Sequence, residues 1–188
     1  MEPDRVPRRH SPFWRWFGRT YLRLTGWRIE CSLPNLPKFV IAVAPHTSNW
    51  DFPTGAAVMF ALDFKLSYIG KHTLFRPPFG GLFRWMGGIP VDRSVPNGMV
   101  DSSIRAFAQS EQLALVIAPQ GTRKPVPRFK TGFLRIARGA GVPVLLAALD
   151  YGTKCVRLGP LVVPGEDIEA ERERLEQYFG TFKGKRPR

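Results

Sequence analysis

The chain of 188 residues contains few cysteines and few histidines. Its two cysteines, Cys31 and Cys155, lie far apart and form no CxxC pair, which argues against a zinc ribbon or a disulfide framework. We expect both thiols to be reduced, as is usual in a cytoplasmic protein. The three histidines, His10, His46 and His72, show no metal-ligand spacing. The sequence therefore predicts no metal and no redox cofactor.

Acidic residues are also scarce. Fifteen Asp and Glu stand against 28 Lys and Arg, and the formal net charge is +13. Such an excess favours an anionic partner, which could be nucleic acid, anionic lipid headgroups or a phosphorylated substrate. Charge alone leaves these three classes open.

Long hydrophobic runs are absent, since no stretch approaches the ~20 apolar residues of a membrane span. Charged residues and prolines interrupt the first dozen positions, so we expect no signal peptide. Hydrophobic residues nevertheless make up 44% of the chain. This composition is typical of a globular protein, and the length suggests one domain.

The segment SPFWRWFGRTYLRLTGW (11–27) predicts an amphipathic helix. Ser11 and Pro12 suit a helix start, with the hydroxyl as cap and proline in the first turn. At ~100° per residue the side chains divide into two faces. The apolar face contains Phe13, Phe17, Tyr21 and Leu24, and the opposite face contains Arg15, Arg19 and Arg23. Such a helix could lie in a bilayer interface or pack on its own domain. The tryptophans in and beside the segment favour the bilayer.

Short apolar runs alternate with helical patterns along the rest of the chain. Strands are predicted at 39–44, 66–70, 88–92, 113–118 and 142–150, and helices near 53–63, 73–86, 97–110 and 130–140. The second of these helices is interrupted by Pro77, Pro78, Gly80 and Gly81. This alternation indicates a single α/β domain, with a largely parallel or mixed sheet flanked by helices and an N-terminal amphipathic helix. Sites in such sheets lie beyond the carboxyl ends of the strands.

One candidate site follows the first predicted strand, in the stretch APHTSNWDFPTG (44–55). His46 and Asp51 are five residues apart, and in a regular helix their side chains would not share a face. They can meet only if the chain turns between them, and Ser48, Asn49 and Pro53 suit such a turn. A carboxylate that holds one imidazole nitrogen leaves the other free as a general base. A capping Asp beside a surface His is the alternative.

Cations and small polar residues follow three other predicted strands. Lys71 and Arg93 each follow a strand, and PQGTRKPVPRFKTG (119–132) follows another. Gly121 allows a tight backbone there, with Thr122, Arg123 and Lys130 near it. These residues are consistent with a phosphate site beside the His/Asp pair, although solvated surface cations are the alternative.

Four blocks in order across residues 40–150 resemble the glycerolipid acyltransferase family, which includes lysophosphatidic acid acyltransferases. HTSNWD matches the His-x4-Asp block, and GKHTLFRPPFGGLFRWMGGIPVDRS matches the second. PQGTR matches the Glu-Gly-Thr-Arg block, and GVPVLLAAL matches the fourth. One departure is clear: Gln120 stands where the family's third block begins with Glu. The transmembrane helices of many members are absent, and the amphipathic segment could replace them.

The resemblance implies acyl transfer from acyl-CoA or acyl-carrier protein to a hydroxyl of a glycerol phosphate, lysophospholipid or related lysolipid. His46 would act as the general base, and Asp51 would orient it. The implied substrate-binding residues are Lys71, Arg93, Gln120, Gly121, Thr122 and Arg123. The Gln at position 120 leaves the acceptor open. We divide the chain into a basic amphipathic segment (1–30) and an acyltransferase domain (31–188).

Two other functions compete with this interpretation. A nucleic-acid-binding module would explain the charge but not the four ordered blocks, so we expect no nucleic acid partner. A catalytically silent lipid-binding relative would keep the fold without turnover, and Gln120 favours it. The predicted partners are the acyl thioester donor, the lysolipid or glycerol-phosphate acceptor and an anionic membrane surface. The predicted location is cytoplasmic, peripheral on the inner face of the membrane.

Overall fold

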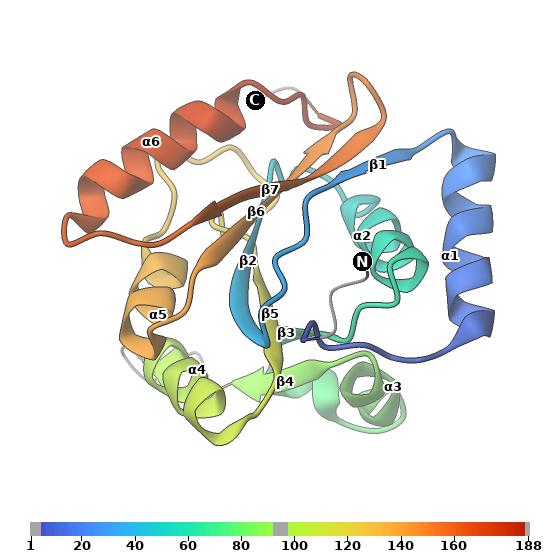
Figure 1. Ribbon diagram of the computed structural model, residues 1–188, viewed down its shortest axis with the longest axis horizontal. Coiled ribbons are helices and arrows are strands. Elements are labelled where there is room, and N and C mark those ends of the chain that lie inside the picture. Colours follow the sequence, from blue (N-terminus) through green and yellow to red (C-terminus); the bar gives the residue numbers. More distant parts are fainter. Residues whose placement is uncertain (1–4, 92–97, 187–188) are drawn as a thin grey trace.

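The computed structural model describes residues 5–91 and 98–186. Within this part of the chain, seven strands form one mixed sheet in the order β1-β7-β6-β2-β5-β3-β4 (Figure 1). The strands are β1 (Arg28–Cys31), β2 (Lys38–Ala44), β3 (Leu66–Lys71), β4 (Gly88–Val91), β5 (Leu113–Ile117), β6 (Val144–Asp150) and β7 (Cys155–Val162). The five strands from β6 to β4 are mutually parallel. The hairpin strand β7 runs antiparallel to β6, and β1 pairs parallel to β7. The predicted α/β class with a mixed sheet is confirmed.

Helices cover both faces of the sheet, with α1 and α2 on one side and α4, α5 and α6 on the other (Figure 1). The helices are α1 (Pro12–Thr25), α2 (Asp51–Ala61), the 3-10 helix η1 (His72–Phe75), α3 (Gly80–Trp85), α4 (Gly98–Gln109), α5 (Gly132–Ala140) and α6 (Ile168–Gly180). Alternate residues of β2 serve the two cores: Phe39 and Ile41 face α1 and α2, and Val40 and Ala42 face α4, α5 and α6. Burial on both faces explains why the central strands read as continuous apolar runs.

Three elements were not predicted from the sequence, namely β1, β7 and α6. The middle of β7 carries Gly159 and Pro160, and much of the strand is exposed, so it lacks a continuous apolar run. Helix α6 is rich in Glu and Arg and buries mainly Leu175 and Phe179 besides Arg172. Both elements therefore carry weak hydrophobic periodicity. Strand β7 gains its place by pairing with β6, and α6 gains its place by packing on the sheet.

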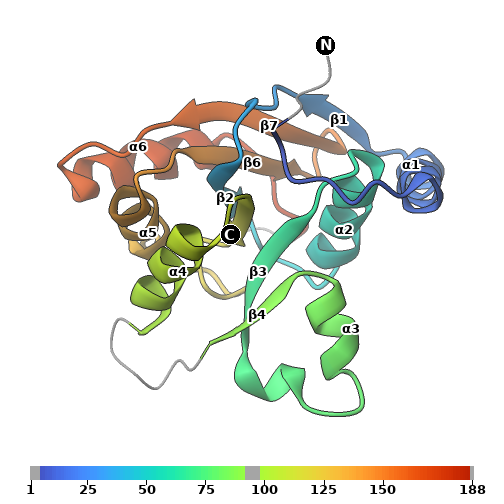
Figure 2. The ribbon, with the colours of Figure 1, turned by 60° about the horizontal axis from the view of Figure 1, so that its bottom comes forward.

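The predicted helix at 73–86 is instead two short helices, η1 and α3, which lie beside β3 and β4 (Figure 2). Pro77 and Pro78 separate them, and neither can donate a backbone hydrogen bond. A Cβ on Gly80 would lie 2.0 Å from the carbonyl oxygen of Phe75. Only glycine permits this close approach, so the interruption is built into the sequence.

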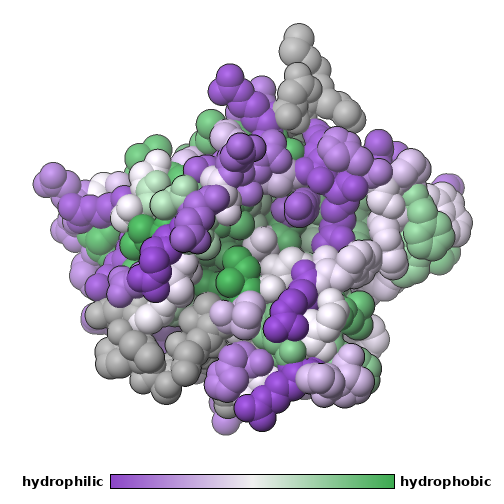
Figure 3. All heavy atoms as spheres, turned by 90° about the horizontal axis from the view of Figure 1, so that it is seen from below, coloured by the Kyte–Doolittle hydropathy of each residue, from purple (hydrophilic) through white to green (hydrophobic). Residues whose placement is uncertain are grey.

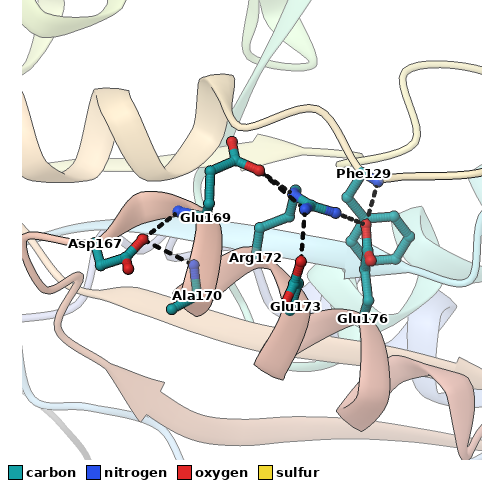
Figure 4. Close-up of polar contacts among 7 residues, drawn as sticks. All are labelled: Phe129, Asp167, Glu169, Ala170, Arg172, Glu173 and Glu176. Carbon is teal, nitrogen blue, oxygen red and sulfur yellow. Dashed lines mark hydrogen bonds and ion pairs between the residues drawn. The ribbon is translucent and has the colours of Figure 1, made fainter.

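Helix α6 is attached to the loop before α5 by a polar network (Figure 4). The Arg172 side chain is buried, and its guanidinium donates hydrogen bonds to Glu169, Glu173 and Glu176 at 2.9 to 3.2 Å. Glu176 also accepts a hydrogen bond from the backbone N–H of Phe129. The network therefore links α6 to the loop that carries PQGTR.

The N-terminal helix begins at Pro12 with Ser11 at the N-cap position, as predicted, but the Ser11 hydroxyl makes no capping bond. Instead, the backbone N–H of Ser11 donates to Asp63, which lies just after α2. The predicted apolar face does not form the main contact with the domain. Gly18 and Leu22 are the buried residues of α1. The Trp14 ring stacks on the Phe60 ring of α2, with ring centroids 4.6 Å apart.

Gly18 marks the closest approach between α1 and α2. A Cβ at this position would lie 2.5 Å from the Ala57 carbonyl oxygen and 2.5 Å from the Ala61 nitrogen. The two backbones therefore pack without an intervening side chain. The boundary expected at residue 30 falls inside β1, which pairs with β7.

Candidate active site

The turn between β2 and α2 carries the predicted His/Asp pair. Strand β2 ends at Ala44 and α2 begins at Asp51, so the chain reverses over six residues. The Ser48 hydroxyl accepts the Trp50 N–H at 3.2 Å and tightens this turn. The turn brings His46 Nδ1 to 2.9 Å from Asp51 Oδ2. The two residues therefore meet at the carboxyl end of a central strand.

Asp51 is buried, and both of its carboxylate oxygens accept hydrogen bonds. Besides the His46 ring, Oδ2 accepts the backbone N–H groups of Thr47 at 2.8 Å and Ser48 at 2.9 Å. The other oxygen, Oδ1, accepts the Tyr151 hydroxyl at 2.8 Å. Burial alone would raise the pKa of Asp51, but the hydrogen bonds from His46, Ser48 and Tyr151 outweigh it, so the pKa lies below its usual value. The carboxylate is therefore ionised at neutral pH.

Gln120 connects the His/Asp turn to the loop after β5. Its side chain is buried, with 2% of its surface exposed, and its Oε1 accepts the backbone N–H of His46. A Glu side chain carries the same acceptor atom, so this hydrogen bond does not require the carboxylate of the family's third block. The neutral amide accepts this hydrogen bond without placing a second negative charge near Asp51.

A cavity of about 610 Å³ opens beside His46. Its apolar lining comes from Ile69, Met99, Val100, Val116, Ile117, Ala118, Pro119 and Phe133. Its other lining residues include Gly121, Thr122, Arg123 and Lys130. The cavity thus joins an apolar wall, an imidazole and cations, and could hold a chain of CH₂ groups next to an anionic group.

The loop at 119–130 brings several of the predicted site residues to the same cavity. Gly121 has a φ of 66°, a value that L side chains rarely adopt. The Lys130 side chain passes over it, 3.2 Å from where a Cβ would be. Arg123 is exposed at the cavity wall. The structure therefore brings His46, Gly121, Thr122 and Arg123 together, with Gln120 behind them.

Two predicted residues are placed less fully. Lys71 is the last residue of β3, at the same edge of the sheet as the end of β2, which is where the strand pattern predicted it. Arg93 lies outside the described residues.

Sequence reasoning missed the residues that surround the turn from the far end of the chain. Tyr151 follows β6, and its ring meets Trp27 edge to face with centroids 4.9 Å apart. The Tyr151 N–H donates to the Lys183 carbonyl oxygen at 2.8 Å, and the Arg186 N–H donates to Thr47 Oγ1 at 3.3 Å. No local pattern marks these contacts, because the partners are 32 or more residues apart in the sequence.

In residues 5–91 and 98–186, no group of three or more His, Cys, Asp or Glu side chains could hold a metal ion. None of the helices in this part of the chain is long and apolar enough to cross a membrane.

The fold and the site together define a class of protein: an α/β protein with a His–Asp pair after a central strand, in which the Asp is buried and the His borders a largely apolar cavity. The family model described as Acyltransferase matches residues 28–149. The chain belongs to this acyltransferase family, and the predicted family is confirmed. No curated protein sequence matches the chain.

A solved structure shares the fold. The chain is similar to the 1-acyl-sn-glycerophosphate (LPA) acyltransferase PlsC from Thermotoga maritima, with 20% sequence identity and a TM-score of 0.61. The alignment covers 92% of this chain and 80% of that protein. At this identity the match demonstrates a common fold.

Proposed function

We propose that the protein transfers a fatty acyl group from acyl-CoA or acyl-carrier protein to a hydroxyl of a glycerol phosphate, lysophospholipid or related lysolipid. The observation that carries this proposal is the 2.9 Å contact between His46 Nδ1 and Asp51 Oδ2 at the edge of the cavity. Since Nδ1 is engaged by the carboxylate, Nε2 is left to act on a substrate. The substrate of PlsC, the structural relative, is a lysolipid of this class.

In this mechanism the acceptor hydroxyl attacks the thioester carbonyl carbon while His46 Nε2 removes its proton. Asp51 holds the ring in one tautomer and offsets the charge of the imidazolium. When the tetrahedral intermediate collapses, the C–S bond breaks and the thiolate leaves with the proton that His46 carried. The products are the O-acyl ester and the free thiol, and no covalent acyl-enzyme is required.

Arg123 and Thr122 would bind the phosphate of the acceptor, with Lys71 and Arg93 as further cations. Arginine suits phosphate because its planar group donates two parallel hydrogen bonds. The neutral Gln120 leaves more of the positive charge of this wall uncompensated than a Glu would. This difference favours acceptors with a higher negative charge than lysophosphatidic acid.

The direct test is a screen of purified protein with labelled acyl-CoA and labelled acyl-carrier protein against a panel of lysolipids, with mass spectrometry of the products. We expect one donor and a phosphorylated acceptor to give a diacyl product. Binding of lysolipid without product for any donor would instead support the silent lipid-binding relative. Stronger binding to DNA or RNA than to anionic vesicles would favour the nucleic-acid interpretation.

We further propose that the protein binds anionic membranes peripherally through α1. The outer face of this helix exposes Phe13, Trp16, Phe17 and Leu24. Figure 3 shows hydrophobic surface at its right-hand edge, the side on which α1 lies in Figure 1. The Trp14 ring also lies beside the Trp85 ring of α3, with ring centroids 5.4 Å apart, so α3 adjoins this face. The lysolipid and the product both partition into bilayers, and a docked enzyme would meet them there. A location on the inner face of the membrane stays a prediction.

A further inference from the structure

The hydroxyl of Tyr151 contacts the carboxylate of the His46–Asp51 pair, and Tyr151 does not line the cavity. It donates to Asp51 Oδ1 at 2.8 Å, and the residue is not among those that line the cavity. All the other hydrogen bonds to Asp51 go to Oδ2 and come from its own turn. Tyr151 therefore supplies the contact that ties the carboxylate to the sheet instead of to the turn.

Tyr151 is itself held on three sides. Its ring lies against Trp27, its backbone N–H donates to Lys183, and its hydroxyl donates to Asp51. Burial, followed by the Asp51 carboxylate, raises the pKa of Tyr151, so the phenol keeps the proton that it donates. The hydroxyl therefore donates its proton to a hydrogen bond with Asp51.

The C-terminal segment strengthens this arrangement from the outside. A Cβ on Gly184 would lie 2.7 Å from Thr47 Oγ1, so the backbone of residue 184 packs directly on the residue after His46. The Lys183 carbonyl oxygen holds Tyr151, and the Arg186 N–H bonds to Thr47. The same short segment thus contacts both the turn and the tyrosine.

We propose that Tyr151 is a positioning residue for the His46–Asp51 pair, fixing the plane of the carboxylate so that Oδ2 faces His46 Nδ1. A carboxylate held by donors from its own turn alone could rotate with that turn. A donor from the end of β6 ties it to the rigid sheet, which is how a second layer of contacts maintains a catalytic geometry. This inference rests on the proposed function, in which His46 is the general base and Asp51 orients it.

The test is Tyr151→Phe, which removes the hydroxyl and keeps the ring against Trp27. The matched control is Tyr178→Phe in α6, which loses a comparable hydrogen bond, from its hydroxyl to the Gly159 carbonyl at 2.7 Å. We expect Tyr151→Phe to lower kcat about tenfold or more, with KM for donor and acceptor within about twofold of the wild type. Tyr178→Phe should leave both constants unchanged.

The pH profile separates positioning from general destabilisation. The Tyr151 hydrogen bond lowers the pKa of Asp51, so in Tyr151→Phe the coupled His46–Asp51 pair takes up a proton at higher pH. The acid limb of kcat against pH should therefore move upward in Tyr151→Phe and stay in place in Tyr178→Phe. The ionisable groups facing Asp51 are His46 and Tyr151. Equal kcat and equal acid limbs in the two variants would overturn the proposal.

A second readout does not depend on turnover. The His46 Nδ1–H proton should give a downfield NMR signal, assigned by its loss in His46→Ala. Faster exchange of this proton in Tyr151→Phe than in Tyr178→Phe supports positioning, and identical exchange contradicts it. If the wild type transfers no acyl group, the proposed function fails, and this signal still decides whether Tyr151 orders the pair.

Discussion

At the scale of single residues, the site depends on the hydrogen bonds that a short turn donates to one buried carboxylate. Asp51 accepts four hydrogen bonds, three of them from the turn itself. The pairing of His46 and Asp51 was predictable because both lie within one six-residue turn. The role of Gln120 was not, since its acceptance of the His46 N–H links positions 74 residues apart. This hydrogen bond holds two of the four family blocks, HTSNWD and PQGTR, next to each other in space.

The first prediction concerns the general base. His46→Ala should abolish acyl transfer while the protein stays folded, because no other group in the described site is placed to take the proton of the acceptor. Asp51→Asn should lower kcat by several orders of magnitude through loss of the correct tautomer. Steady-state kinetics and circular dichroism check both. His10→Asn is the control, since Asn tolerates the φ of 53° at that exposed position. Turnover by folded His46→Ala close to that of the control would remove the general-base assignment.

The second prediction concerns the phosphate wall. Arg123→Ala should reduce kcat/KM about tenfold or more for phosphorylated acceptors and much less for neutral ones, since hydrogen bonds between charged groups contribute ~1.5–3 kcal/mol. Arg128→Ala removes an exposed cation from the same loop without changing the residues that line the cavity and serves as the control. Similar losses on phosphorylated and neutral acceptors would show that Arg123 supports the loop rather than the substrate.

At the scale of elements, the packing of α1 separates two faces that the sequence did not distinguish. The sequence placed Tyr21 with Phe13 and Phe17, whereas the helix is buried through Gly18 and Leu22. The predicted apolar face is left on the outside, where three of its four members are exposed. The helix packs on its own domain, as one interpretation predicted, and it also leaves aromatics exposed; binding to a bilayer stays a prediction.

The third prediction tests this contact between helices. Gly18→Ala should destabilise the fold by ~1–3 kcal/mol, the usual cost of overpacking, because its Cβ would meet the backbone of α2 at 2.5 Å. Gly55→Ala in α2 has no heavy atom within 4 Å of the new Cβ, so we expect it to be neutral or stabilising by ~0.5–1 kcal/mol. Urea titrations of the two variants measure the difference. A Gly18→Ala protein as stable as Gly55→Ala would mean that α1 does not hold this position in solution.

At the scale of the whole molecule, charge and exposed apolar area point toward a lipid surface. The net charge is +13, and α1 combines exposed aromatics with Arg15, Arg19 and Arg23. Each basic residue near an anionic bilayer contributes ~1 kcal/mol of attraction, which salt screens. Buried aromatic area adds a part that salt does not screen.

The fourth prediction follows from this combination. The protein should sediment with phosphatidylserine-containing vesicles and be only partly released by high salt. Replacing Phe13, Trp16 and Phe17 with Ser should release it and lower activity on bilayer acceptors, while activity on soluble short-chain acceptors persists. Point changes are preferable to deleting α1, because deletion would uncover Ala57 and Phe60. Replacing the exposed Leu161 of β7 and Val163, the residue just after β7, is the control. Vesicle binding by the triple variant equal to that of the control would place the docking surface elsewhere.

The sequence alone determined the features that are local or repeated along the chain. The order of strands and helices in the parallel core follows from apolar runs of the right length, and His46 and Asp51 follow from one short turn. The interruption between η1 and α3 follows from two prolines and glycines in a row. These inferences succeed because each depends on residues only a few positions apart, where backbone geometry limits what the chain can do.

Only the tertiary structure decided which distant residues complete the site. Tyr151 reaches Asp51 across 100 positions, and Arg186 reaches Thr47 across 139. Strands β1 and β7, at one end of the sheet, and the charged helix α6 gain their places from the sheet, not from their own periodicity. The physical reason is that such contacts form only after the central strands have paired, so no local pattern of residues encodes them. The identity of the buried face of α1 is decided in the same way, by a glycine that fits against α2.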